Sequence, residues 1–164
     1  LAVLQDVLAS ESLTGKAAAQ VAQPKSGVRL IPTRIGGFNY VIVVNAEKSD
    51  SYIMADKQQM LRVFNNLINN SVQAIGKREN GRIDINIVDN GPTWRVEVAD
   101  NGSGISDEQA KKIFSPSFTT KSGGMGLGLA MVRNILSGIG AVISFTSREG
   151  EGTSFFMEIP KLSQ

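Results

Sequence analysis

The 164-residue sequence contains no cysteine and no histidine, and each absence removes a class of chemistry. Without cysteine, the chain has no disulfide and no thiolate metal site. Without histidine, it has no Ser-His-Asp triad, no imidazole metal ligand and no histidine of its own to phosphorylate. A function that needs an imidazole must therefore obtain it from another domain or chain.

Long apolar runs and an excess of one charge sign are also missing. No run approaches the ~20 apolar residues that a membrane span needs, and no signal-peptide pattern opens the chain. The 17 basic and 15 acidic residues give a formal net charge of +2, which offers no support for contact with nucleic acid or with an anionic membrane. Because residue 1 is Leu1 and not Met, we expect a fragment or a processed chain.

The remaining composition is that of a soluble globular domain. Hydrophobic residues make up 41% of the chain and charged residues 20%. A length of 164 residues suits one domain with a sizeable core. Its elements can therefore be predicted from hydrophobic periodicity and turn signals.

The first third of the chain carries weak structural signals. Apolar residues at helical spacing predict a short helix over 1–13, and the composition of 14–26 predicts a loop or weak helix. The β-rich run Tyr40–Val44 predicts a first strand, with a break at Gly36-Gly37 before it. Residues 52–55 predict a short second strand.

A long amphipathic helix is predicted from the N-cap Asp56 to about Ile75. At 3.6 residues per turn, one face carries Leu61, Phe64, Ile68, Val72 and Ile75, and the opposite face carries Arg62, Asn66, Asn70 and Gln73. A solvated face is the usual reading of lone asparagines. Asn disfavours a helix relative to Lys or Glu, so two amides in register need some compensation.

The second half of the chain has clearer turn signals. Alternating residues 82–89 and 93–99 predict an antiparallel hairpin, whose second strand delivers Asp100 to the sheet edge. Ser106 predicts the N-cap of a short helix. Beyond it we expect a lid over 114–124, a helix over 125–138 and a final hairpin of 141–147 with 153–159. This order predicts an α/β two-layer sandwich, a mostly antiparallel sheet with helices on one face.

Two glycine motifs suit a site for a purine and its phosphates. In Asp100-x-Gly102-x-Gly104, the carboxylate can accept from an exocyclic amine, and the glycines let backbone approach a ligand closely. The alternative is that Asp100 only helps to form a turn. The series Gly124-x-Gly126-x-Gly128 can offer backbone N–H groups to anions at a helix start. Alone it is equally well a tight turn with close helix packing, and it lacks the Gly-Lys-Ser/Thr ending of a P-loop.

The combination of motifs is more specific than any single one. Asn66 and Asn70, Asp-x-Gly-x-Gly, Phe-x-Pro-x-Phe-Thr-Thr-Lys, Gly-x-Gly-x-Gly and a terminal Gly150-x-Gly152-Thr153 occur in one order. This order resembles the ATP-binding catalytic domain of sensor histidine kinases, in the superfamily of gyrase, Hsp90 and MutL. The resemblance covers roughly residues 52–159, and the ending Asn-Asn-Ser-Val-Gln-Ala-Ile with the Thr-Thr-Lys lid is most similar to the nitrogen-regulation type.

The resemblance implies a fold and a domain division. It implies a Bergerat-type ATP-binding fold, with a mixed, mostly antiparallel sheet covered on one face by three helices and with an ATP lid. Residues 46–164 would form the histidine-kinase-like catalytic domain. Residues 1–45, which hold the N-terminal helix, loop and first strand, match the family poorly, although we expect one globular domain in all.

The resemblance also implies the roles of individual residues. Asn70 would ligate the Mg²⁺ that bridges the phosphates, and Asn66 would face the same phosphates. Asp100 would accept from the adenine amino group, Gly102 and Gly104 would let the chain pass close to the base, and Ile105 would pack on it. Thr153 would help to hold the base through water. Thr120 and Lys121, on the lid, would reach the γ-phosphate. The implied nucleotide-binding set is completed by Phe114, Gly124, Met125, Gly126, Leu127, Gly128 and Leu129.

Phe114 and Arg62 carry weaker assignments in this set. A phenylalanine is more often a core residue than a ligand contact, and Phe114 fits that alternative. Arg62 is a lesser candidate for phosphate contact. Asn66 and Lys121 are the residues that the resemblance implies for catalysis.

Two departures from the family limit these assignments. Many members have a basic residue where this chain has Gln73, so Mg²⁺, Lys121 or a partner domain must meet the phosphate charge. The phosphoacceptor histidine is also absent from the chain. We therefore expect a catalytic domain that binds ATP and phosphorylates a histidine on a separate dimerisation domain, with a response regulator downstream.

Two other functions compete with this one. Gyrase-like and Hsp90-like ATPases and the anti-sigma serine kinases carry an acid at the position of Asn66, and an amide cannot act as a general base. A nucleotide-sensing module or slow ATPase without phosphotransfer stays open, given Gln73. We expect no nucleic-acid or membrane contact by this chain and a cytoplasmic location, whether or not the full-length protein is membrane-anchored.

Overall fold

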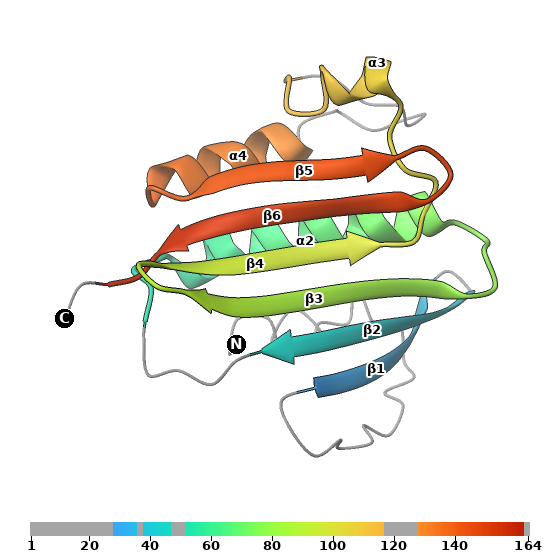
Figure 1. Ribbon diagram of the computed structural model, residues 1–164, viewed down its shortest axis with the longest axis horizontal. Coiled ribbons are helices and arrows are strands. Elements are labelled where there is room, and N and C mark those ends of the chain that lie inside the picture. Colours follow the sequence, from blue (N-terminus) through green and yellow to red (C-terminus); the bar gives the residue numbers. More distant parts are fainter. Residues whose placement is uncertain (1–27, 36–37, 47–51, 117–127, 163–164) are drawn as a thin grey trace.

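The computed structural model describes residues 28–35, 38–46, 52–116 and 128–162 (Figure 1). The predicted helix over 1–13, the segment 14–26, the break at Gly36-Gly37 and most of the predicted lid lie outside these residues. Within them, no helix is long and apolar enough to cross a membrane.

Six strands form one sheet in the order β1-β2-β3-β4-β6-β5. Their bounds are β1 Val28–Ile35, β2 Phe38–Ala46, β3 Gly81–Asn90, β4 Thr93–Asp100, β5 Val142–Arg148 and β6 Gly152–Pro160. All neighbouring strands are antiparallel except β2 and β3, which are parallel and are joined through a helix. The sheet is therefore mixed and mostly antiparallel, as predicted.

The long helix α2 (Lys57–Ile75) begins and ends where the sequence predicted. Asp56 caps it by accepting a hydrogen bond from the backbone N–H of Gln59 at 2.8 Å. Leu61 was predicted to face the core but is only partly buried, because the buried stripe is centred one residue away. The residues of that stripe are Met60, Val63, Phe64, Leu67, Ile68, Ser71, Val72 and Ile75.

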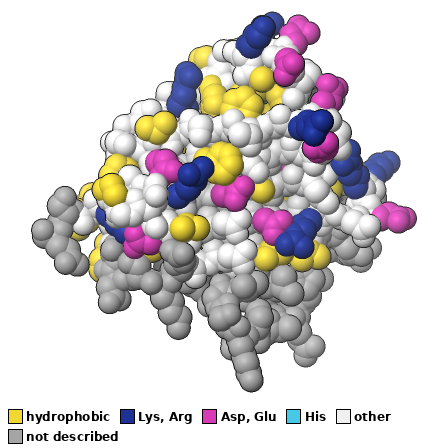
Figure 2. All heavy atoms as spheres, viewed as in Figure 1, with side chains coloured by type: hydrophobic (Ala, Val, Ile, Leu, Met, Phe, Trp, Pro, Cys, Tyr) yellow, Lys and Arg dark blue, Asp and Glu magenta, His cyan; other side chains and the backbone are white. Residues whose placement is uncertain are grey.

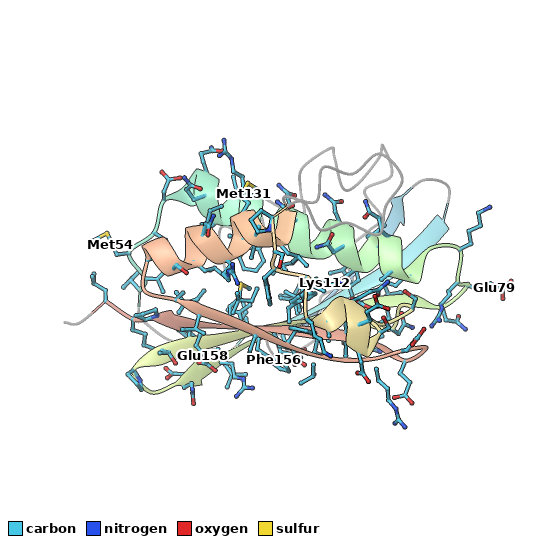
Figure 3. All side chains as sticks on the ribbon, turned by 90° about the horizontal axis from the view of Figure 1, so that it is seen from above. Met54, Glu79, Lys112, Met131, Phe156 and Glu158 are labelled. Atoms are coloured by element: carbon cyan, nitrogen blue, oxygen red, sulfur yellow. The ribbon has the colours of Figure 1, made fainter. Side chains whose placement is uncertain are left out.

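Helices α2 and α4 (Gly128–Gly138) lie on the same face of the sheet (Figure 3). The third helix, α3 (Asp107–Ala110), is a single turn beyond the β5 edge (Figure 1). It is capped by Ser106 as predicted. The core between the two layers includes fully buried Leu67, Ile68, Ile83, Ile85, Val98, Val132, Leu136 and Met157. This arrangement confirms the predicted two-layer α/β fold.

The opposite face of the sheet bears no helix among the described residues and is turned toward the viewer in Figure 2. Amide and carboxylate side chains bridge its strands: Asn45 Nδ2 donates to Asn86 Oδ1 at 2.7 Å, and Asn86 Nδ2 donates to Glu97 Oε2 at 2.8 Å. The Arg95 guanidinium lies 4.9 Å from the centroid of the Phe156 ring. This face is therefore polar, and some of its side chains form hydrogen bonds with one another.

The predicted strand at 52–55 is wrong. The chain is neither helix nor strand there, and Tyr52 and Met54 are 71% and 73% exposed. The carbonyl of Tyr52 accepts a backbone hydrogen bond from Leu162 at 2.7 Å, which ties the segment to the end of β6 without a strand ladder. β-forming side chains do not make a strand where no neighbouring strand pairs with them.

Both predicted hairpins are confirmed. Strands β3 and β4 pair from Ile83↔Asp100 to Asn90↔Thr93 around a two-residue turn. Gly91 has φ 69° in that turn, and its N–H donates to Asp89 Oδ1 at 3.0 Å. The strand β1 was not predicted separately from β2.

Candidate functional site

One row of the sheet is polar on the face that the helices cover. Asp100 at the end of β4 continues the inward alternation of Val96 and Val98. Cross-strand neighbours share a face, and the register pairs Asp100 with Thr153 and Thr153 with Ser147. The row from β3 to β5 is Ile83, Asp100, Thr153 and Ser147. The adjacent row is apolar and consists of Ile85, Val98, Phe155 and Phe145.

The Asp100 carboxyl group is held in a mostly buried position. Burial raises its pKa, and four smaller effects lower it: the Gly102 N–H, the Ser71 hydroxyl, the Thr153 backbone and the charge of Arg78. The Gly102 N–H donates to Asp100 Oδ1 at 2.9 Å. A buried carboxyl group with acceptor capacity to spare suits a ligand that brings hydrogen-bond donors.

Ser71 faces this carboxyl group from α2 and was missed in the sequence. It is fully buried, and its hydroxyl makes no hydrogen bond of normal geometry to the described residues, although it is near enough to lower the Asp100 pKa. A buried hydroxyl without a good partner costs stability of about 1–3 kcal/mol. Ser71 and Asp100 therefore have hydrogen-bonding capacity left over, which a polar ligand or a water would satisfy.

The two glycines after Asp100 are required by contacts within the protein. A Cβ at Gly102 would lie 2.6 Å from Ala74 Cβ, and the next residue, Ser103, donates from its N–H to the Ala74 carbonyl at 2.9 Å. Gly104 has φ 70°, and a Cβ there would lie 2.1 Å from the Arg148 carbonyl oxygen. These contacts hold the loop against α2 on one side and against the β5–β6 turn on the other.

Asn101 ties the same loop to the start of β3. Its Nδ2 donates to the Asn80 carbonyl at 2.7 Å, and its Oδ1 accepts from the Arg82 N–H at 2.8 Å. Arg78 Nη1 donates to the Asn101 carbonyl at 2.9 Å. The sequence showed Asn101 inside the motif but gave no signal for these partners, which come from the turn after α2 and the start of β3.

Ser147 and Gly152 complete the far side of the loop. The Ile105 N–H donates to Ser147 Oγ at 2.8 Å, and Ile105 packs against the core. A Cβ at Gly152, which has φ 132°, would lie 2.0 Å from the Asp100 carbonyl oxygen. Gly152 therefore lets β6 approach β4 closely enough to place Thr153 beside Asp100.

The Asn66 amide of α2 faces the start of α4. A Cβ at Gly128 would lie 2.6 Å from Asn66 Oδ1, and Asn66 Nδ2 donates to the Arg62 carbonyl at 2.8 Å. Asn70, also partly buried, lies one helical turn further along α2. The first N–H groups of a helix have no partner within it and attract anions. Asn66 and the start of α4 therefore form a polar corner suited to phosphate.

Residues 55–163 match the family described as the histidine kinase-, DNA gyrase B- and HSP90-like ATPases. The chain belongs to this family. Its described fold, with two helices over a mostly antiparallel sheet and a polar row beneath α2, agrees with that assignment.

Curated relatives of this ATPase-family chain include histidine kinases. It is 41% identical over 108 residues to the sensor histidine kinase ZraS of Escherichia coli K12, which is 66% of this chain and 23% of ZraS. It is 35% identical over 132 residues to sporulation kinase A of Bacillus subtilis, covering 80% of this chain and 22% of that kinase. The chain thus spans about a quarter of the length of these curated relatives.

A solved structure of the same family superposes on the chain. The catalytic domain of histidine kinase ThkA, in a nucleotide-free form, has 37% sequence identity and a TM-score of 0.63. The match covers 74% of this chain and 77% of that one. The family assignment therefore rests on both sequence and fold.

Phe114 lies in an aromatic cluster of this ATPase-family domain. Its ring centroid is 5.9 Å from that of Phe145 and 6.5 Å from that of Phe155, both in edge-on geometry. The Arg133 guanidinium lies 5.7 Å from the Phe114 centroid. The alternative of a core residue is thus supported, and Phe114 anchors the chain that follows α3 to the sheet.

The remaining predicted site residues are divided between described and undescribed parts. Leu129 is partly buried and packs against the core. The structure does not describe Thr120, Lys121, Gly124, Met125, Gly126 and Leu127, so their roles stay predictions. Among the described residues, no group of three or more carboxylates could hold a metal ion by itself. A metal at this site would need its further ligands from phosphate and water, as Mg²⁺ commonly takes them.

Proposed function

We propose that this chain is the catalytic domain of a sensor histidine kinase, which binds Mg-ATP and presents the γ-phosphoryl group to a histidine on a separate domain. The family assignment and the kinase relatives support this proposal. The chain has no histidine, so the phosphoacceptor must be supplied from elsewhere.

The observation that carries the proposal is that α2 joins the two halves of the site. Ser71 and Ala74 of α2 contact the Asp100 loop, and Asn66 of the same helix contacts the start of α4. Between Asn66 and Ala74 the helix rises by roughly 12 Å at 1.5 Å per residue. An extended nucleotide has its base and its phosphates separated on this scale, so one rigid element can position both ends.

At the base end, the chain would recognise adenine by accepting hydrogen bonds. Asp100 would accept from the 6-amino group, and Thr153 beside it would help to hold the ring directly or through water. Ile105, which packs against the core beside them, would form an apolar wall. A guanine carbonyl at the same place would face a carboxylate, which disfavours it.

At the phosphate end, charge must be balanced and the γ-phosphoryl group held in line. The N–H groups at the start of α4 and the lid residues Thr120 and Lys121 would contact the phosphates. The oxygens of Asn66 and Asn70 would complete the coordination of Mg²⁺, whose chemistry is to neutralise charge that develops on the phosphate oxygens. The residues present fit this ion, because neutral amide oxygens are suitable ligands when phosphate supplies the negative charge.

Asn66 favours phosphotransfer over water activation. An amide has no basic lone pair for proton abstraction, so it cannot serve as the general base that a hydrolase needs at this position. Catalysis would then come mainly from positioning and charge stabilisation. A nucleotide-sensing module with slow hydrolysis is the second candidate, because Gln73 is exposed and brings no positive charge to the phosphates.

The partners and subtype belong to the same proposal. The full-length kinase would supply a dimerisation and histidine-phosphotransfer domain, act on a response regulator and place this domain in the cytoplasm. The nitrogen-regulation subtype rests on the Asn-Asn-Ser-Val-Gln-Ala-Ile ending of α2 and on Thr119-Thr120-Lys121. The relatives reported above do not carry that name, so it is a narrower proposal than the kinase function.

Calorimetric titration with ADP and with a non-hydrolysable ATP analogue, with and without Mg²⁺, tests nucleotide binding. The substitution Asp100→Ala should abolish measurable binding, because it removes the acceptor for the adenine amino group. The matched control is Asp84→Ala on the helix-free face, where Asp84 pairs with Arg82. Unchanged affinity in the Asp100 variant would remove the adenine assignment.

Labelled ATP distinguishes the kinase from the sensing module. The chain is mixed with the histidine-bearing domain of its own kinase, and label transfer to that domain is measured. Transfer that depends on the histidine supports the proposal. Absence of transfer, under conditions where the intact kinase is labelled, favours the sensing module.

A further inference from the structure

The Ser147 hydroxyl on β5 has three polar neighbours in the polar row and the loop beside it. It accepts from the Ile105 N–H at 2.8 Å and donates to the Gly152 carbonyl at 3.0 Å. Its Oγ also lies 2.8 Å from the Oγ1 of Thr153, a contact in which either oxygen could be the donor. Ser147 is partly buried and Thr153 is 5% exposed, so bulk water competes little for these contacts.

All three contacts of Ser147 can be hydrogen bonds at once in only one arrangement, and that arrangement gives the ambiguous contact a direction. A serine hydroxyl has one hydrogen and two acceptor lone pairs. The Gly152 carbonyl can only accept, so the Ser147 hydrogen is directed to it. The Ile105 N–H can only donate, so it takes one lone pair. The other lone pair is left for Thr153, which must therefore be the donor in the 2.8 Å contact.

This assignment fixes which hydrogen-bonding role Thr153 can take toward a ligand beside Asp100. Its one hydrogen points along the row toward Ser147, so its remaining capacity toward a ligand is that of an acceptor. Thr153 is the cross-strand neighbour of Asp100, which is also an acceptor when ionised. Two acceptors side by side favour a ligand edge with donors and disfavour one with a carbonyl.

We propose that Ser147 is a positioning residue that locks the Thr153 hydroxyl as an acceptor and thereby selects purines with a 6-amino group over purines with a 6-oxo group. This inference rests on the proposed function, because it assumes that the purine lies against Thr153. It gives β5 a role in nucleotide specificity, although that strand carries none of the predicted site residues.

The test is the ratio of the dissociation constants for IDP and ADP, measured by calorimetry on the same preparation. Inosine replaces the 6-amino group by a carbonyl and leaves the phosphates unchanged. Ser147→Ala frees the Thr153 hydroxyl to turn and donate to the 6-oxo group. We expect the ratio to fall by about tenfold, the effect of one redirected hydrogen bond. The control Ser144→Ala, at an exposed position on the same strand, should leave the ratio unchanged.

Two further variants separate specificity from folding. Ser147→Thr keeps the hydroxyl in a β-branched side chain that suits a strand, and it should keep the wild-type ratio. Thr153→Val keeps the shape of Thr153 and both other bonds of Ser147, and it should lower the ratio even if Ser147→Ala does not fold. In the Thr153→Val background, Ser147→Ala should have no further effect on the ratio.

The outcomes distinguish this inference from the proposed function. If wild type does not bind ADP, the proposed function fails and this inference fails with it. If wild type binds ADP normally but Ser147→Ala and Thr153→Val weaken ADP and IDP by the same factor, the selective role of Ser147 is overturned alone. Independent, additive effects of the two substitutions on the ratio would also overturn it.

Discussion

Gly128, the first residue of α4, lies directly against the side-chain oxygen of Asn66 on α2. A Cβ at Gly128 would lie 2.6 Å from Asn66 Oδ1, closer than carbon and oxygen normally approach. The oxygen is at the far end of a flexible side chain, so the amide can move aside while the two helices stay in place. A substitution at Gly128 can therefore disturb the site without disturbing the fold.

Gly128→Ala should separate binding from stability. We expect the free energy of unfolding to change by less than about 1 kcal/mol, because the added methyl displaces only a side chain and alanine favours a helix. Affinity for Mg²⁺ with an ATP analogue should fall by about tenfold, or about 1.4 kcal/mol, because Asn66 leaves the phosphate corner. Urea denaturation and calorimetry measure the two effects.

The control for this variant is Gly138→Ala, at the other end of α4. A Cβ at Gly138 would meet no atom within 4 Å, so nothing needs to move. Its nucleotide affinity should equal that of wild type. Equal affinity in the Gly128 variant as well would mean that Asn66 is not used at the phosphate end.

Asp100→Asn should make stability less dependent on pH. Burial raises the pKa of Asp100 in the folded state above the ordinary value of 3.8. Between 3.8 and the raised pKa the unfolded chain binds fewer protons at this site than the folded chain, so the wild-type free energy of unfolding falls as pH rises. The Asn variant has no carboxyl group at this position, so its free energy of unfolding should not fall for this reason as pH rises.

The prediction is checked by urea denaturation of both proteins over a pH series. The stability of the Asn variant relative to wild type should increase as pH rises from below 3.8 through the folded-state pKa, and should level off above it. The opposite trend would mean that the hydrogen bonds to the carboxylate outweigh burial. Nucleotide binding should be lost in the variant at every pH.

Arg78→Met should move the pH dependence of ADP binding. The positive charge of Arg78 lowers the pKa of Asp100, so its removal raises that pKa further. Because the ionised carboxylate is the better acceptor for the adenine amino group, the midpoint of the gain in ADP affinity should shift to higher pH. Calorimetry over a pH series that begins below 3.8 measures this midpoint in both proteins.

The matched control here is Arg82→Met, whose guanidinium pairs with Asp84 on the outward side of the sheet. It removes the same charge from a nearby strand without contacting Asp100. A shift of equal size in both variants would indicate an effect of net charge rather than of Arg78.

Gly102→Ala should destabilise the whole domain. Its Cβ would lie 2.6 Å from both the backbone carbon and the Cβ of Ala74, which are parts of α2 and cannot turn aside. Overpacking of this kind costs about 1–3 kcal/mol, and we expect a matching loss in the free energy of unfolding. Ser103→Ala, an exposed neighbour, should change stability by no more than about 0.5 kcal/mol. A Gly102 variant as stable as wild type would show that the loop does not depend on this contact.

Local signals in the sequence predicted most of the fold. The cap at Asp56, the periodicity of α2 and the turn at Gly91 act over a few residues, and each element formed where it was predicted. The strand order did not follow from such signals. The parallel pairing of β2 with β3, and the pairing of β4 with β6, join segments far apart in the chain. The prediction of a strand at 52–55 was wrong for the same reason, because a strand forms only where a neighbouring strand pairs with it.

Part of the candidate site could be predicted from the sequence. Asp100 could be recognised because it ends an apolar strand before two glycines, and Asn66 because an amide is unusual on an exposed helix face. The glycines were expected to make room for a ligand, yet their closest approaches are to Ala74 and Arg148. Ser71 and Ser147 carry no local motif, since each matters only through the neighbours that packing and strand register give it.

The groups that we propose to bind the base lie on inner strands of the core sheet. Asp100 and Thr153 belong to neighbouring inner strands, each of which is paired on both sides. A purine would therefore meet acceptors that are already fixed, and its binding would lose little conformational entropy on the protein side. Their amide hydrogens should exchange with deuterated solvent as slowly as those of the core, with or without nucleotide. This half of the proposed site should be lost only when the entire domain unfolds.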